Sequence, residues 1–293
     1  MLPVHLIETE KDLGDYYDSL LKKNITRIAL DMEGDQGSVK YHYSISILQC
    51  FDGENTAIVD VKKIGNKPVL KEFLTCSNII KVMFSCRNDL FMTQNVLGYS
   101  IDPIRDIAVA QKILGLKENI SEYIGIGRDK KDVFQRANWL KRPLSKDLLE
   151  YAVNDVIRLL DIEENFTITL KEKGLYEEYI RICSNLIKRD YRINQLEQYK
   201  NKFPGYKKLN SEEKKLAKTV WIFRELFGEY FNCPSGYVLS KKAMIEIVKD
   251  KGNLNQRLKD EINKKRRSQK KLDDAIIENF YNKAKLQTDK IKQ

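Results

Sequence analysis

The sequence has few of the residues from which proteins build zinc sites. It contains only two histidines, both within the first 42 residues, and five cysteines that are scattered along the chain without a CxxC pair. This supply excludes a zinc site of familiar spacing. We therefore expect the protein to work in a reducing, cytoplasmic environment.

Long apolar runs are absent as well. No stretch approaches the roughly 18 apolar residues that span a bilayer. The opening segment, MLPVHLIETEKDL, reaches acidic residues within eight positions, which is not the pattern of a signal peptide. We expect no membrane partner.

The composition is that of a globular protein. A length of 293 residues predicts about two domains. The 42% apolar content is sufficient for a packed core, and the 32% charged and 10% aromatic contents fit a folded rather than a disordered chain.

The positive charge is concentrated in the second half of the chain. The net charge is −4 over residues 1–180 and +14 over residues 181–293, within a total of +10. Lysine-rich helices can be basic merely because they are solvated, but a surplus of this size more often neutralises phosphates. The asymmetry indicates a part that carries out chemistry, joined to a part that binds a polyanion such as nucleic acid.

Residues 1–178 show the patterns of an α/β domain. Three strand patterns follow one another over residues 25–61, and shorter strands near 79–84 and 101–106 then alternate with helices. This succession predicts a mixed sheet covered by helices.

Strand signals disappear after about residue 178. Residues 179–210 predict a helical connector, and residues 211–286 predict four or five short helices that form a small all-α bundle. Residues 287–293 are expected to be a tail.

Acidic residues stand out near the ends of two predicted strands. Asp31 and Glu33 are two residues apart at the end of an otherwise apolar strand, so both carboxylates project from one face of it. Asp89 opens a helix directly after the strand at 79–84, where chain ends gather at a sheet edge. Taken singly, each has an ordinary explanation, as a solvated strand end or a first-turn acid.

A tyrosine and a third aspartate share one face of a helix. Tyr151 and Asp155 are four residues apart in the segment 145–173, which predicts one long helix. Ser145 is the expected N-cap of that helix and Gly174 its C-terminal stop. Taken alone, the pair would be a solvated edge of an amphipathic helix.

Together, these acids predict a centre for phosphoryl transfer. Carboxylates beside apolar positions are costly unless a cation neutralises them, and hard divalent ions such as Mg²⁺ prefer oxygen ligands. Two such ions about 4 Å apart stabilise the attacking and leaving oxygens of a phosphoryl transfer. A tyrosine one turn before an aspartate can orient the attacking water.

Three segments resemble the motifs of a known enzyme family. LDMEGD, SCRNDL and LLEYAVNDV are similar to the three exonuclease motifs of the DEDD superfamily of 3′→5′ exonucleases, in its tyrosine-containing branch. The longer stretch ANWLKRPLSKDLLEYAVNDVIRLLDI especially resembles ribonuclease D. The resemblance covers roughly residues 5–175.

The resemblance implies a fold and a set of site residues. The fold would be a ribonuclease H-like (DnaQ-like) mixed sheet flanked by helices. Two divalent ions, Mg²⁺ or Mn²⁺, would be held by Asp31, Glu33, Asp89 and Asp155, and Tyr151 would position the attacking water. The implied activity is that of a 3′→5′ exoribonuclease that releases nucleoside 5′-monophosphates. Its implied partner is RNA with a free 3′-end, such as tRNA or other small RNA precursors, and a monomer is expected.

The second half resembles another module of the same proteins. WIFRELFGEYFNCPSGYVLSKKAMIEIV is similar to an HRDC domain, the small helical module that follows the nuclease in ribonuclease D. The match depends on Arg224, Asn232, Pro234 and the step Val238–Leu239–Ser240.

Two positions depart from the family pattern. Phe84 and Ser85 stand where a His-Asn or similar pair is common, and Gly34 stands where a large apolar residue often follows the motif glutamate. A glycine there also resembles a sub-branch that includes RNA-binding members without activity. Two alternatives therefore accompany the exoribonuclease: a single-strand DNA 3′→5′ exonuclease, and an inert RNA-binding protein on the same fold.

Further residues are candidates for nucleic-acid contact. Phe84 can stack on a terminal base or belong to the core, and Arg142 can touch the scissile phosphate or cap the sheet. The densest cationic run is either a phosphate-binding surface or a solvated helical face. It contains Lys264, Lys265, Arg266 and Arg267.

Overall fold

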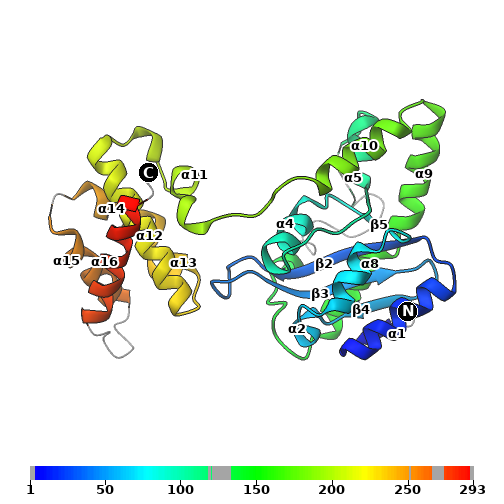
Figure 1. Ribbon diagram of the computed structural model, residues 1–293, viewed down its shortest axis with the longest axis horizontal. Coiled ribbons are helices and arrows are strands. Elements are labelled where there is room, and N and C mark those ends of the chain that lie inside the picture. Colours follow the sequence, from blue (N-terminus) through cyan, green and yellow to red (C-terminus); the bar gives the residue numbers. More distant parts are fainter. Residues whose placement is uncertain (1–3, 118–119, 121–132, 251, 266–273, 291–293) are drawn as a thin grey trace. The chain divides into compact units, whose positions relative to one another are not determined.

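The chain forms two compact units, each with its own hydrophobic core (Figure 1). The computed structural model describes residues 4–117, 120, 133–250, 252–265 and 274–290. The first unit contains Met1–Asp35 and Tyr43–Arg192, and the second contains Gln36–His42 and Ile193–Gln293.

The first unit is built on a six-stranded mixed sheet with the order β1-β4-β3-β2-β5-β6. Its strands are β1 (Val4–Ile7), β2 (Arg27–Asp35), β3 (Ser44–Phe51), β4 (Thr56–Val59), β5 (Ile80–Met83) and β6 (Ile104–Asp106). Strand β3 is antiparallel to both β2 and β4, whereas β1 is parallel to β4, and β5 is parallel to both β2 and β6. The predicted mixed sheet is confirmed, although the edge strand β1 is not among the strands expected from the sequence.

Helices cover this sheet (Figure 1). They are α1 (Glu10–Lys22), α2 (Val61–Ile64), α3 (Pro68–Thr75), α4 (Arg87–Val96), α5 (Ile107–Ile113), α8 (Lys146–Val156), α9 (Leu159–Glu172) and α10 (Tyr176–Ile187). Helix α8 lies against β3 and β2, where Ala152 and Val153 form an apolar cluster with Ile47 and Ile58. Among the described helices, none combines the length and the apolarity that crossing a membrane would require.

The segment expected to form one long helix forms two. Helix α8 ends at Val156 and α9 begins at Leu159, although no glycine or proline lies within residues 145–173. The break coincides with a change of packing partners, because α8 lies mainly on β3 whereas α9 packs mainly against α5, and both helices contact β2. Ser145 caps α8 as predicted and accepts a hydrogen bond from the backbone N–H of Leu148 at 3.3 Å.

All regular secondary structure in the described part of the second unit is helical, whereas its segment Gln36–His42 forms neither helix nor strand. The unit contains η1 (Gln195–Glu197), α11 (Tyr199–Lys202), η2 (Tyr206–Lys208), α12 (Ser211–Tyr230), α13 (Ser235–Val238), α14 (Lys241–Lys249), α15 (Leu254–Lys265) and α16 (Asp274–Lys290). Its core is centred on α12, where Trp221 and Phe223 are buried with Phe280 of α16. The predicted all-α region is confirmed, and its likeness to an HRDC domain stays a prediction.

The junction between the units lies later in the chain than residue 178. That residue falls inside α10, and Tyr179 and Cys183 of this helix are buried in the core of the first unit. Tyr199 and Phe203, which were expected in a connector, belong to the core of the second unit. Because residues at both ends of the expected connector are buried in one core or the other, the connection between the two units is shorter than the 179–210 segment predicted from the sequence.

Gly34 lies at a β-bulge between β2 and β3. Glu33 pairs with Ile47 and Gly34 pairs with Ile45, so one residue of β3 has no partner on β2. A Cβ atom at position 34 would lie 2.2 Å from the backbone oxygen of Ser44. Only glycine allows the two backbones to approach so closely, which explains this departure from the family pattern.

We predict that Gly34→Ala destabilises the first unit by at least about 2 kcal/mol, because the added methyl group must push the two strands apart. Gly14→Ala is the matched control: a Cβ there meets only a methyl group of Val69 at 3.9 Å, and alanine favours the helix by about 0.5–1 kcal/mol. Urea unfolding of both variants measures the difference. Equal stabilities would show that the bulge accommodates a side chain.

Candidate active site

The predicted metal-binding residues of β2 and α8 meet on one face of the sheet. Asp31 and Glu33 project from the same side of β2, and Asp155 approaches from α8. One carboxylate oxygen from each of the three lies within 4.8 Å of the other two. Among the described residues, no other group of three His, Cys, Asp or Glu side chains is spaced so closely.

Asp89 is an electrostatic neighbour of this cluster. It lies in the first turn of α4 and is buried. Burial raises the pKa of its carboxyl well above the usual range, and the negative charge of Asp31 raises it further. The structure therefore groups three of the four acids closely and makes Asp89 an electrostatic neighbour of Asp31.

The turn between β5 and α4 sets the position of Asp89. Ser85 in this turn has a φ of 57°, which is unusual for a residue with a side chain. Asp106 holds the turn by accepting hydrogen bonds from the backbone N–H groups of Ser85 at 2.8 Å and Cys86 at 3.1 Å. It also caps α5 by accepting from the N–H of Ala108 at 2.9 Å. Sequence reasoning missed Asp106, whose position before a helix signals an N-cap but not this link.

Tyr151 is packed so that only its hydroxyl group serves the site. Its ring lies 4.9 Å from that of Phe134 and 6.1 Å from that of Trp139, centre to centre. Its hydroxyl is hydrogen-bonded to Asp155. Burial raises the pKa of the phenol, and the charge of Asp155 adds to the effect. The group therefore stays protonated at neutral pH and donates to the carboxylate.

Arg142 braces the segment that leads into α8. Its guanidinium group donates to both carboxylate oxygens of Asp60, at 2.6 and 2.8 Å, and to the backbone oxygen of Trp139 at 2.8 Å. It also donates to the hydroxyl of Ser46 at 3.0 Å. Ser46 is the bulge residue of β3, and its hydroxyl in turn donates to the backbone oxygen of Trp139.

All three guanidinium nitrogens of Arg142 thus have partners within the protein. The sequence left open whether this residue touches phosphate or caps the sheet, and the structure supports capping. The ion pair with Asp60 is largely enclosed, since the two side chains are 18% and 2% exposed. Removing one partner of such a pair leaves the other charge buried and unpaired.

The remaining nucleic-acid candidates are one residue of the first unit and four of the basic run in the second. Phe84 is partly buried against the core of the first unit. Lys264 and Lys265 are the last residues of α15. Arg266 and Arg267 lie outside the described residues.

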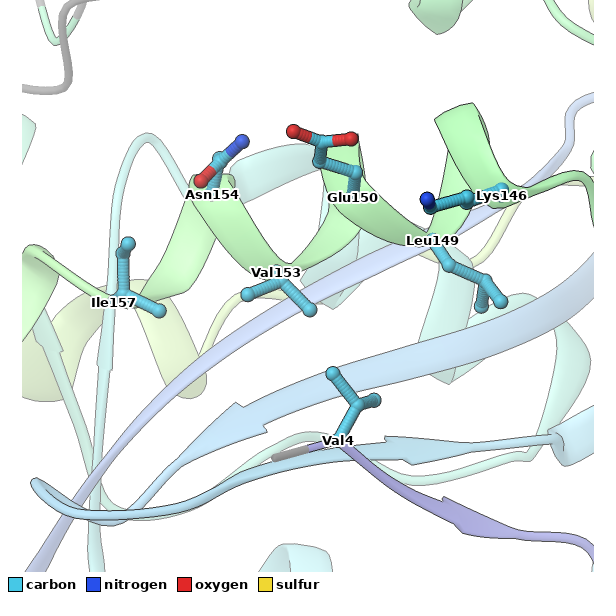
Figure 2. A pocket seen from close by; sticks show the side chains of 7 residues that line it. All are labelled: Val4, Lys146, Leu149, Glu150, Val153, Asn154 and Ile157. Atoms are coloured by element: carbon cyan, nitrogen blue, oxygen red, sulfur yellow. The ribbon is translucent and has the colours of Figure 1, made fainter. Parts of the chain in front are cut away.

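An apolar groove of about 470 Å³ runs along the other side of α8 (Figure 2). Leu149 and Val153 point from the helix toward Val4 of the edge strand β1, and Ile157 also lines the groove. Successive helical residues are about 100° apart, so Val153 and Asp155 project about 200° apart. The groove is therefore separate from the acidic cluster.

The acidic cluster suits divalent cations. Its four acidic side chains offer only oxygen ligands, which hard ions such as Mg²⁺ and Mn²⁺ prefer. The pKa of Asp89 is raised first by burial and then by the negative charge of Asp31, so the ionised carboxylates repel one another. Bound cations would relieve this repulsion, so these side chains fit the divalent cations that the sequence implies.

A model of the 3′-5′ exonuclease family matches residues 4–171, which is more than half of the chain. The chain belongs to this exonuclease family. The matched range contains all four acids and Tyr151, so the family assignment and the geometry concern the same site.

Curated relatives carry the name ribonuclease D. The chain is 31% identical over 163 residues to ribonuclease D of Xanthomonas oryzae and 31% identical over 153 residues to that of Escherichia coli. These alignments cover 54% and 50% of this chain and 44% and 40% of the relatives. A third, from Desulfotalea psychrophila, is 26% identical over 256 residues, covering 83% of this chain and 66% of that protein. The chain thus spans at most about two thirds of the length of these relatives.

Solved structures share the fold of this chain. Escherichia coli RNase D, described as an exoribonuclease involved in structured RNA processing, matches with a TM-score of 0.76 and 21% identity. The catalytic core of RRP6 from Trypanosoma brucei matches with a TM-score of 0.78 and 19% identity. Each match covers 97% of this chain, and 75% and 80% of the respective neighbours.

We predict that Arg142→Lys lowers the free energy of unfolding by about 2–3 kcal/mol, because a lysine cannot replace the bidentate contact with Asp60. The salt dependence of RNA binding should stay as in the wild type, since no phosphate contact is lost. The exposed neighbour Lys141 provides a control, and Lys141→Met should change stability by less than about 0.5 kcal/mol. If the slope of the logarithm of the RNA-binding constant against the logarithm of salt concentration falls by about 1 in Arg142→Lys, this residue instead contacts phosphate.

Proposed function

We propose that the protein is a metal-dependent 3′→5′ exoribonuclease of the ribonuclease D type, which removes nucleotides one at a time and releases nucleoside 5′-monophosphates. The proposal rests on one observation: carboxylate oxygens of Asp31, Glu33 and Asp155 lie within 4.8 Å of one another. Asp89 and Tyr151 are their electrostatic neighbours. The names of the curated relatives support RNA as the substrate. We further propose that it acts as a cytoplasmic monomer.

The four acids would hold two divalent cations, Mg²⁺ or Mn²⁺. Bound there, the cations would polarise the scissile phosphate and lower the pKa of the attacking water. Asp31 and Glu33 belong to a central strand and Asp155 to a helix packed on it, so the protein fixes the ligands on rigid elements.

Tyr151 would orient the attacking water rather than deprotonate it. Its pKa is raised by burial and by Asp155, so the phenol keeps its proton. The hydroxyl group donates a hydrogen bond to Asp155. Its oxygen still has a lone pair that can accept a hydrogen bond from the attacking water. This contact can hold the water in line with the scissile bond.

The substrate would be RNA with a free 3′-end, such as tRNA or other structured precursors. The net charge of +14 over residues 181–293 supports contacts between the second half of the chain and the phosphate backbone. Such contacts position a substrate without reading its sequence.

A time course on 5′-labelled single-stranded RNA tests the proposal. With Mg²⁺ or Mn²⁺ we expect a ladder that shortens from the 3′-end, and with EDTA we expect none. Asp155→Asn should abolish cleavage while leaving RNA binding nearly unchanged, because it removes one ligand charge and little volume. Asp147→Asn changes an exposed acid on the same helix and should cleave as the wild type does.

The same assay distinguishes the alternatives. Shortening of DNA but not of RNA of the same sequence would indicate a DNA exonuclease, because the 2′-hydroxyl is the principal difference. RNA binding without shortening in either metal would indicate an inert scaffold. Near-normal cleavage by Asp155→Asn would contradict the proposed site.

We predict that Tyr151→Phe lowers kcat about 100-fold and changes KM for RNA by less than about threefold. The ring keeps its contacts with Phe134 and Trp139, so only the hydroxyl is lost. Tyr16→Phe removes a buried hydroxyl that has no hydrogen-bond partner among the described residues, and this control should keep normal kcat. Single-turnover and steady-state kinetics measure both variants. An unchanged kcat in Tyr151→Phe would rule out the orienting role.

A further inference from the structure

Gln49 of β3 carries a buried amide group whose hydrogen bonds are not satisfied by the described residues. The side chain is 0% exposed, and neither its nitrogen nor its oxygen has a hydrogen-bond partner there. A buried amide without partners costs free energy that an apolar side chain of similar size would not. The fold alone therefore gives no reason for a glutamine at this position.

The strand register places Gln49 directly beside Asp31. Gln49 pairs with Asp31 on β2 and with Ile58 on β4, and residues opposite one another in antiparallel strands share a face. Its neighbours along β3 on that face are Ile47 and Phe51. Among these four adjacent residues, only Asp31 is polar.

Helix α8 encloses this part of the sheet. Ile47 and Ile58, which flank Gln49 on the same face, pack with Ala152 and Val153 of α8. The amide is therefore shut off from solvent by the same helix that carries Asp155. Side chains directly opposite one another have Cβ atoms about 4.5–5.5 Å apart, so the amide of a glutamine can reach the carboxylate of Asp31.

We propose that Gln49 is a positioning residue of the metal centre: its Nε2–H group, which has no partner among the described residues, would donate a hydrogen bond to the Asp31 carboxylate when that carboxylate holds a cation. The inference rests on the proposed function, in which Asp31 holds a cation. A donor to a ligating carboxylate fixes its orientation, and losing such a donor typically weakens metal binding 10–100-fold. Gln49 suits this task because it donates without adding a negative charge to the acidic cluster.

Thr56 of β4 offers a matched control. Its hydroxyl is also fully buried and has no hydrogen-bond partner among the described residues. It pairs with Phe51 on β3 and with Val4 on β1, so it is not adjacent to Asp31. Gln49→Met and Thr56→Val each remove an unpaired polar group from the same face, but only the first removes a donor beside the metal site.

The test measures binding of Mn²⁺ to the full-length protein without RNA, by calorimetry or electron paramagnetic resonance. Gln49→Met should weaken Mn²⁺ binding about 10–100-fold, whereas Thr56→Val should stay within about twofold of the wild type. In EDTA, both variants should melt at or above the wild-type temperature, because each loses an unsatisfied buried group. Wild-type Mn²⁺ affinity in Gln49→Met would overturn the proposal.

A second measurement avoids substitution altogether. In the ¹⁵N-labelled wild type, the side-chain NH₂ signals of Gln49 should shift when Mg²⁺ saturates the site, and unmoved signals would overturn the proposal even if Gln49→Met fails to fold. Mn²⁺ binding without RNA cleavage would contradict the proposed function, yet a weakened Gln49→Met would still support the role of Gln49. A wild type that binds no Mn²⁺ would overturn both.

Discussion

Mutual repulsion among four carboxylates is the constraint on which the structure of the first unit depends. Asp31, Glu33 and Asp155 place oxygens within 4.8 Å of one another, and Asp89 is buried beside them. Charges of one sign do not gather unless other interactions hold them there. Apolar packing of α8 on β3 holds Asp155 near the acids of β2. The buried carboxylate of Asp106 holds the turn before α4, and with it Asp89.

The position of α8 follows from the bulge in β3. Gly34 lets the two strands approach closely enough for the bulge to form. The bulge leaves Ser46 free to bind Trp139 and Arg142, and Arg142 is anchored on Asp60 of the neighbouring segment. A departure from the family pattern next to Glu33 is thus tied, through four hydrogen-bonded residues, to the helix that supplies Tyr151 and Asp155.

Local patterns, together with the family resemblance, singled out the acids but not the residues that support them. Strand alternation placed Asp31 and Glu33 on one face of a strand, and helical spacing placed Tyr151 and Asp155 on one face of a helix. These are properties of a few neighbouring residues. The break between α8 and α9, the edge strand β1 and the roles of Asp106 and Arg142 depend on contacts between residues distant in sequence. No local signal carries them: the helix break has no glycine or proline, and Arg142 precedes its helix as a phosphate-binding residue would.

The division of charge follows from the chemistry of the site. The part of the chain that holds the acids has a net charge of −4 over residues 1–180, so by itself it would repel a polyanion. Cations bound to the acids would offset only the charge at the reacting phosphate, within about one Debye length of 8–10 Å. Attraction for the rest of an RNA must therefore come from elsewhere, and residues 181–293, with a net charge of +14, can supply it. The segment that holds the acids and the segment proposed to contact RNA thus each carry the sign of charge that suits the proposed role.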